Sequence, residues 1–323
     1  MKAVTTLKTG SIDRVKVKRL GRTVQAILLG IGKALIMIGI SYIILGPLIS
    51  MLSSSFFTAN DLYNPVVVTF PMEGTLENYV ITYKTMQYPK TLFSTAVYVG
   101  FLTFIQVLVC SMAGYGFARF DFPCKKLLFG WVILTIVLPT DTLMMPWYTE
   151  FRNFDVFGIL HLVTGKGVNL LTSPVPMYIM TVFACGLRSG LFIYIFNQFF
   201  RGLPKEIEEA AFVDGAGSFY TYFRIMLVNA MPSVLTVSIF SMVWQYNDTF
   251  YAQLFGINSS LLMSRRITTV METISKAKNI TDGNVAQLYL YAGIIMMLVP
   301  VIIGYCLLQK RFVEGVERSG IVG

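Results

Sequence analysis

The sequence predicts an all-α membrane protein that crosses the bilayer six times. Of its 323 residues, 55% are hydrophobic and only 13% are charged, and the mean hydropathy is +0.65. Six long apolar runs alternate with polar segments, and the basic residues gather in every second polar segment. A soluble domain carries about a quarter of charged residues, so this composition places the chain in a membrane.

Each apolar run is long enough to cross the hydrocarbon core, which needs about 20 helical residues. Between the first two runs, residues 53–90 carry the prolines, asparagines and aspartates of turns, so we expect an outer loop there. Residues 257–284 form another outer loop. Residues 1–26 are polar and basic and read as a partly disordered tail; a signal peptide is the alternative, but the run that follows is too long for one. We expect membrane helices at 27–52, 92–117, 127–147, 173–200, 230–251 and 287–308, a six-helix domain at 27–308 and a C-terminal tail at 309–323.

The distribution of lysine and arginine predicts which side each loop lies on. The segments assigned to the cytoplasm hold 16 of these residues and the outer loops hold 8, while Lys33 and Arg188 fall inside expected helices. Because cytoplasmic loops are enriched in positive charge, both termini are predicted to be cytoplasmic. The same rule puts the loop at residues 203–228 in the cytoplasm.

Aromatic residues recur about every third position in the outer segment at 148–170. Phe151, Phe154, Phe157 and Leu160 have the spacing of a helix that lies in the membrane interface. An ordinary loop with buried aromatic residues is an equally open alternative. His161, the single histidine, is interpreted as an interface residue.

Several classes of function lack their required residues. The net charge of +9 comes from residues between apolar runs, not from a soluble basic module, so nucleic-acid binding is not expected. Gly165-Lys166 lacks the surroundings of a phosphate-binding loop, and no catalytic or metal motif is visible. We therefore expect no cofactor, metal or catalytic group in this chain. The four cysteines are scattered and read as packing residues: Cys110, Cys124, Cys185 and Cys306.

A polar segment between the fourth and fifth runs has the marks of a short helix. Pro204 suits a first helical turn, and three carboxylates near the start favour the positive end of a helix. Ala210 and Ala211 leave a flat face that another backbone could approach, and Gly215 allows a turn before a second amphipathic piece at 219–227. The carboxylates are Glu206, Glu208 and Glu209.

This segment resembles the EAA motif of permease subunits from binding-protein-dependent ABC importers, in particular the sugar branch. The match consists of Glu209-Ala210-Ala211 followed by Asp214-Gly215-Ala216. Tyr115-Gly-Phe-Ala-Arg119 is similar to a Tyr-Ala-Phe-Ala-Arg segment of the same family, and Phe312-Val-Glu-Gly315 to its ending. The resemblance covers about residues 27–323, with Val228 standing where the family usually has a proline.

The resemblance implies a type I importer permease fold in which loop 203–228 forms a coupling helix that docks on a cytoplasmic ATPase. It further implies two ATPase subunits that bind ATP and magnesium, an extracytoplasmic solute-binding protein, and a second homologous permease that differs from this chain. The implied solute is an oligosaccharide or related carbohydrate. The implied location is the cell membrane of a bacterium or archaeon.

Polar residues inside the expected spans are candidates for the translocation path, because such residues are costly unless they face a cavity or a partner. Asp141 and Arg188 could approach each other or line the path. Alternatively they form a structural ion pair, or Arg188 reaches the interface at a bend near Gly186 and Gly190.

The end of the fifth run offers aromatic faces and polar edges, which together suit sugar rings. This stretch resembles a Trp-Asn-Asp-Phe region of the family. An aromatic belt at the outer interface is the alternative. The candidate residues are Trp244, Gln245, Asn247 and Asp248.

Two other classes of membrane protein remain as rivals. A self-sufficient secondary carrier or channel would need internal repeats or ion-coupling carboxylates, and the only acidic residue deep in a span is Asp141. An intramembrane enzyme would need a convergent catalytic set, and none is visible.

Overall fold

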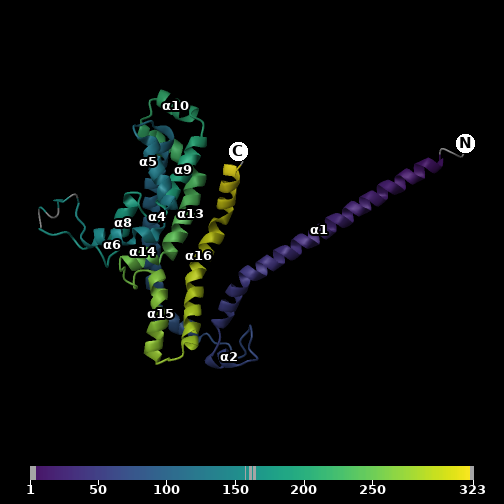
Figure 1. Ribbon diagram of the computed structural model, residues 1–323, viewed down its shortest axis with the longest axis horizontal. Helices are drawn as coiled ribbons and strands as arrows, with labels where there is room; N and C mark the ends of the chain where they lie inside the picture. The colour runs from purple at the N-terminus through teal and green to yellow at the C-terminus, as the bar shows by residue number, and fades with distance from the viewer. Residues whose placement is uncertain (1–4, 157, 160–161, 163–164, 321–323) are drawn as a thin grey trace. The chain divides into compact units, whose positions relative to one another are not determined.

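The structure is a computed structural model that describes residues 5–156, 158–159, 162 and 165–320, with side chains from residue 25 to 307 within those ranges except residue 26. The described chain is helical, apart from one isolated antiparallel bridge between Phe154 and Val168. It forms two compact units, Met1–Thr75 and Leu76–Gly323 (Figure 1). We describe each unit by itself.

The first unit begins with one long helix, α1 (Thr5–Ser54). Its apolar part, Ile27–Ser54, is long enough to span a membrane. The prediction of a partly disordered tail at 1–26 is therefore wrong from residue 5 onward, since the basic segment begins the same helix. Basic residues have good helix propensity, and an apolar helix that is already formed extends through them at little cost.

A single carboxylate organises the loop after α1. Asp61, in α2 (Ala59–Tyr63), forms a capping box with Thr58 and also accepts hydrogen bonds from the backbone N–H groups of Met72 (3.0 Å) and Glu73 (3.2 Å). Burial raises the pKa of the Asp61 carboxyl, but the backbone N–H groups of Thr58, Glu73 and Met72 outweigh that effect and hold the pKa below its ordinary value.

The second unit is a bundle of long and short helices. Two helices of this unit that were missed in the sequence lie within predicted outer loops, at 77–86 in the first and at 263–278 in the loop at 257–284. The elements are α3 (Glu77–Met86), α4 (Tyr88–Arg119), α5 (Lys125–Val137), the 3₁₀ turn η1 (Thr140–Leu143), α6 (Met144–Arg152), α8 (Val175–Val182), α9 (Ser189–Gly202), α10 (Glu206–Val213), α11 (Ser218–Tyr220), the π-helix η2 (Thr221–Met226), α12 (Leu227–Asn229), α13 (Met231–Asn247), α14 (Phe250–Leu254), α15 (Met263–Lys278) and α16 (Gly283–Gly320).

Within the described residues, three helices are long and apolar enough to cross a membrane: the apolar part of α1, α4, and α16 as far as Leu307. They correspond to the first, second and sixth predicted spans. Two bent pairs raise the number to five: α5 with η1–α6, bent by 107°, and α11–α12 with α13, bent by 78°.

The third and fourth spans were predicted as continuous helices, and both predictions are wrong. The third breaks after Val137 at Pro139, whose ring cannot continue the hydrogen bonding of a helix. The fourth is divided into α8 and α9, and Ala184 (φ +56°) and Arg188 (φ +61°) adopt the left-handed conformation between them. That conformation cannot be part of a right-handed helix.

The predicted interfacial helix at 148–170 is not one helix. Helix α6 ends at Arg152, and Phe154 and Val168 then pair in the antiparallel bridge. Phe151 is 2% exposed and stacks between Trp147 and Phe154. This agrees with the alternative interpretation of the segment, a loop with buried aromatic residues. Phe157, Leu160 and His161 lie outside the described residues.

Helices α4 and α9 cross closely in the second unit. A Cβ atom at Gly114 would lie 2.5 Å from Cβ of Phe196 and 2.9 Å from the backbone nitrogen of Asn197. Asn197 also donates a hydrogen bond to the Gly114 carbonyl (3.3 Å). Figure 1 shows α10 at one end of this unit and α15 at the opposite end, with α16 running from the α15 end toward the α10 end.

Candidate functional site

Helix α10 starts and stops for local reasons. It begins at Glu206, so Pro204 precedes the helix and is not part of its first turn as predicted. At its end, the N–H groups of Ala216 and Gly215 donate to the carbonyls of Ala211 (2.9 Å) and Phe212 (3.0 Å), which is the Schellman arrangement. Gly215 has φ +82°, a conformation that favours glycine.

The two faces of α10 differ in exposure. Glu208 and Ala211 are buried, at 7% and 6% exposed. Glu206, Glu209, Ala210 and Val213 are exposed, and we call these four residues the α10 outer face. The EAA motif is thus divided, with two of its residues facing outward and Ala211 facing the bundle. Among the following motif residues, Asp214 and Gly215 are exposed and Ala216 is half-buried.

A buried ion pair ties α10 to the end of α4. The Arg119 Nε atom lies 3.2 Å from Oε2 of Glu208, and the two side chains are only 5% and 9% exposed. The Tyr115 hydroxyl donates a hydrogen bond to Oε1 of the same carboxylate. Arg119 Nη2 also donates to the Leu203 carbonyl (2.8 Å), which fixes the loop that leads into α10. These contacts join α10 and the loop before it to the end of α4.

Sequence reasoning missed this contact. It treated the three glutamates of α10 alike, as helix N-terminal charges. The available signal was the position of Glu208 three residues before Ala211, which puts both on one helix face. A second signal was Arg119, a lone arginine at the end of an apolar helix, which requires a partner if it is buried.

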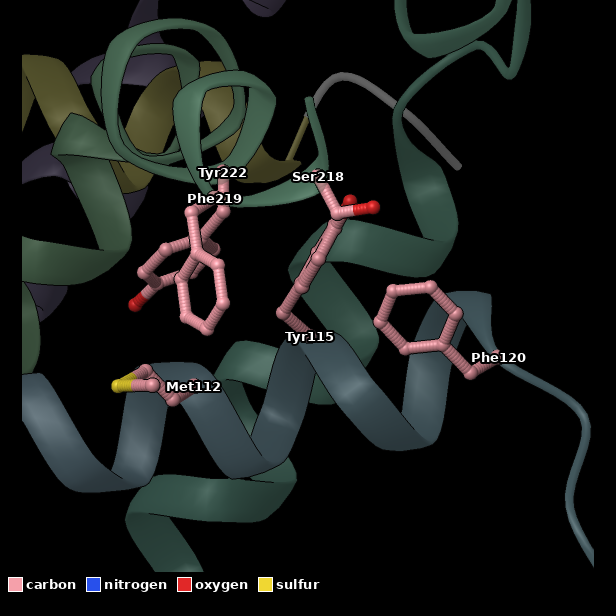
Figure 2. A pocket seen from close by; sticks show the side chains of 6 residues that line it. All are labelled: Met112, Tyr115, Phe120, Ser218, Phe219 and Tyr222. Atoms are coloured by element: carbon pink, nitrogen blue, oxygen red, sulfur yellow. The ribbon is translucent and has the colours of Figure 1, made fainter.

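An apolar cavity of about 280 Å³ lies next to this contact, between α4 and the segment that follows α10. Figure 2 shows Phe219 and Tyr222 opposite Met112 and Tyr115 across it. The Tyr222 hydroxyl is hydrogen-bonded to Ser111 Oγ (2.6 Å), which connects the π-helix to α4 beside the cavity. The six lining residues are Met112, Tyr115, Phe120, Ser218, Phe219 and Tyr222.

The segment after α10 bends although Val228 is not a proline. The 78° bend lies between Asn229 and Met231, and Pro232 stands in the first turn of α13. Because Pro232 has no N–H, it cannot donate to the carbonyl four residues earlier, which is that of Val228. The ladder of helical hydrogen bonds is thus interrupted here by Pro232.

The two charged candidates for the translocation path do not pair with each other. Asp141 is exposed in the turn η1, and no ion pair joins it to Arg188 in the part of the chain that the structure describes. Arg188 was expected near the middle of a continuous helix, but it immediately precedes α9. Its guanidinium carbon lies 5.7 Å from the ring centre of Trp244, at cation–π distance.

The polar candidates on α13 separate into inward and outward groups. Gln245 is 3% exposed and donates to Oε1 of Gln106 on α4 (3.4 Å). Asp248 accepts hydrogen bonds from the N–H groups of Tyr251 (3.2 Å) and Ala252 (3.1 Å), so it caps α14. Asn247 is exposed and Trp244 is half-buried.

Gln106 is the centre of a buried polar cluster that sequence reasoning also missed. Its Nε2 atom donates to the Leu187 carbonyl (2.6 Å) and to Ser189 Oγ (3.0 Å). Its Oε1 atom accepts from Ser241 Oγ (2.6 Å) as well as from Gln245. The cluster thus joins α4, the start of α9 and α13 at one level of the bundle.

No group of three or more His, Cys, Asp or Glu side chains that could hold a metal ion occurs among the described residues. The described residues show two other polar features. The short helix α10 is joined to the long helix α4 by an ion pair, and the breaks before η1 and α9 carry the polar side chains of Asp141 and Arg188. This combination matches what the resemblance in the sequence predicts for the transmembrane permease subunit of a transporter.

Comparison with known proteins identifies the family. Residues 106–313 match the family described as binding-protein-dependent transport system inner membrane component. This is more than half of the chain, and the protein belongs to that family. It is a multi-pass inner-membrane permease subunit of an ABC importer.

The relatives and a solved structure agree with this assignment. A probable ABC transporter permease of Pyrococcus horikoshii is 29% identical over 280 residues, covering 86% of this chain and 92% of the relative. The diacetylchitobiose uptake permease NgcG of Streptomyces coelicolor is 25% identical, covering 86% and 84%. The arabinooligosaccharide transport permease AraQ of Halalkalibacterium halodurans is 26% identical, covering 88% and 93%. A bacterial ABC transporter that imports the polysaccharide alginate shares the fold, with a TM-score of 0.66 at 19% identity, over 88% of this chain and 96% of that one.

Proposed function

We propose that this chain forms half of the translocation path for an oligosaccharide or related carbohydrate and receives its driving force through loop 203–228. The observation that carries the proposal is the division of α10. Its outer face is open to a partner, while Glu208 on its inner face is joined to Arg119 of α4. A helix with one free face and one buried charged contact is suited to transmit a partner's movement.

The proposed partners are two cytoplasmic ATPases that bind ATP and magnesium, an extracytoplasmic solute-binding protein and a second, different permease. This chain itself carries no catalysis. The two-to-one bias of lysine and arginine supports cytoplasmic termini in the cell membrane of a bacterium or archaeon. The sugars named for NgcG and AraQ support a carbohydrate as the solute.

In the proposed mechanism, closure of the ATPases on ATP moves the α10 outer face. The Glu208–Arg119 pair and the bond from Arg119 to Leu203 carry this movement into α4. Because α4 packs closely on α9 at Gly114, the two helices shift together. The Gln106 cluster then carries the shift to α13 and to Arg188 and Trp244, which with Asp141 and Asn247 are the residues we propose for the path. In this proposal Gln245 and Asp248 do not contact the solute: Gln245 is bonded to Gln106, and Asp248 to the backbone of α14.

The test is ATP hydrolysis by the reconstituted complex, measured with and without the binding protein and oligosaccharides. Ala210→Arg puts a bulky charge on the α10 outer face without entering the bundle. We expect it to abolish stimulation while the permease still inserts and pairs. Thr273→Arg, at an exposed position of α15 at the opposite end, is the control and should leave assembly with the ATPases and basal ATP hydrolysis unchanged. Normal stimulation in Ala210→Arg would contradict coupling through α10.

A further inference from the structure

Arg188 is a charged side chain without a charged partner. The ion pairs of the described residues involve Arg119, Lys125, Lys276 and Lys278, but not Arg188. No hydrogen bond joins its guanidinium to another described residue, and the side chain is exposed. Of the nearby carboxylates, Asp248 is occupied by the backbone N–H groups of α14.

The depth of Arg188 makes this isolation costly. Helix α9 has 14 residues and is therefore about 21 Å long at 1.5 Å per residue. Arg188 immediately precedes α9, at the end far from α10. With α10 at the cytoplasmic surface, as proposed above, Arg188 lies about 21 Å from that surface, within a hydrocarbon core of about 30 Å. An unpaired charge at that depth is unfavourable toward lipid and must face a cavity or a partner. A water-filled cavity would hydrate this charge, and no described carboxylate is paired with it, so an anion that binds Arg188 there comes from outside the described part of the chain.

One aromatic contact orients the guanidinium, since its carbon lies 5.7 Å from the ring centre of Trp244. Trp244, which it covers, is itself stacked on Phe240 (centroids 5.5 Å apart) and tilted against Phe192 (5.6 Å). The residues that follow Arg188 and Trp244 in the sequence are held as well. Ser189 and Gln245 are both hydrogen-bonded to Gln106. Arg188 thus has its backbone anchored inward and its charged group supported on an aromatic ring.

A guanidinium presents a planar set of donors that matches the two oxygens of a carboxylate, and the donors of Arg188 are not engaged by any described residue. The Trp244 ring packs against Phe192 and Phe240. Its role in this proposal is to orient the Arg188 guanidinium. We propose that Arg188 binds a carboxylate of the passing solute, so that the imported carbohydrate carries acidic units such as uronates. This inference rests on the proposed function and narrows its substrate class.

The experiment uses the complete complex with its binding protein in liposomes and two probes, a galacturonate trisaccharide and the neutral galactose trisaccharide. ATP hydrolysis and uptake are measured for the wild type, Arg188→Gln and Arg188→Lys. We expect the acidic probe to be taken up by the wild type and its uptake to fall roughly 10- to 100-fold in Arg188→Gln, as for the loss of a charged hydrogen bond. Arg188→Lys should recover part of the uptake, and Arg152→Gln, at the exposed end of α6, should change nothing.

The other outcomes separate the two proposals. If neither sugar stimulates ATP hydrolysis, the carbohydrate function fails and this inference with it. If only the neutral sugar is taken up, or if Arg188→Gln takes up the acidic sugar at the wild-type rate, import stands and the role of Arg188 is overturned. It is also overturned if Arg188→Gln separates the two permeases in gel filtration, since its carboxylate then belongs to the partner subunit.

Discussion

Replacing Glu208 with glutamine tests the contact on which coupling depends. The change keeps the shape of the side chain and removes its charge, so the Arg119 guanidinium, 5% exposed, stays buried without its anion. Removing one partner of a buried pair costs about 3–5 kcal/mol. The Nε–Oε2 contact, although 3.2 Å long, is not aligned as a hydrogen bond, and Arg119 keeps its bond to Leu203. We therefore expect the lower value, about 3 kcal/mol.

A loss of about 3 kcal/mol should make α10 detach from α4 more often. At 1.4 kcal/mol per factor of ten, the equilibrium for detachment of α10 from α4 shifts by more than about 100-fold. Amide hydrogen exchange of residues 206–213 in the permease pair, before the ATPases that would cover the α10 outer face are added, measures this shift. Glu209→Gln is the matched control, because Glu209 is the exposed neighbour on the same helix and should leave exchange unchanged.

The effect on ATP hydrolysis should also be larger for Glu208→Gln than for Glu209→Gln. Glu208→Gln is expected to reduce solute-stimulated ATP hydrolysis, while its basal rate persists. Adding Arg119→Gln to Glu208→Gln should cost little more than either change alone, because the two residues act as one pair. Equal exchange protection in Glu208→Gln and Glu209→Gln, or additive losses in the double variant, would refute the reasoning.

Three further predictions concern other parts of the chain. Gly114→Ala should destabilise the α4–α9 crossing by about 1–3 kcal/mol through overpacking, seen as a lower melting temperature, whereas Gly116→Ala, which meets nothing within 4 Å, should not. Gln106→Leu leaves the Leu187 carbonyl without its donor, while Ser241 keeps its bond to Thr103 Oγ1 (3.3 Å), so we expect about 1–3 kcal/mol lower stability and faster exchange at the start of α9. Because the pKa of Asp61 is lowered, its stabilisation of loop 58–73 is present above the ordinary carboxyl pKa and is lost as the pH falls through the folded-state value. Faster proteolysis of that loop at low pH, absent in Asp61→Asn, measures this.

The sequence predicted the helical membrane fold and three of its spans well, because Ile27, Leu92 and Leu288 each lie in apolar runs that continue for a full membrane thickness. It did not predict where the other runs break. Pro139 was visible, but apolar residues on both sides of it suggested a continuous helix. The left-handed conformation of Ala184 and Arg188 leaves no mark in composition, because neither residue type favours it.

The candidate site was predicted in part. The short helix at α10 follows from its glutamates and alanines, and Gly215 was correctly placed at its turn. Which glutamate of α10 is buried depends on how α10 packs against α4. That packing is set by the tertiary structure and cannot be read from the local sequence. Similarly, Gln106 and Gln245 are more than a hundred residues apart in the chain, and only the folded bundle brings them together.

The gap between α8 and α9 also determines where water reaches the protein. Backbone without helical hydrogen bonds is tolerated at membrane depth only beside protein or a water-filled cavity, never against lipid. We therefore expect the backbone of residues 184–187 to face protein or water in the assembled complex. Cys185 lies in this gap and is exposed, so the chain contains its own chemical reporter. With the other exposed cysteines, Cys124 and Cys306, replaced by serine, its reaction with a membrane-impermeant thiol reagent would follow the opening of this surface during the transport cycle.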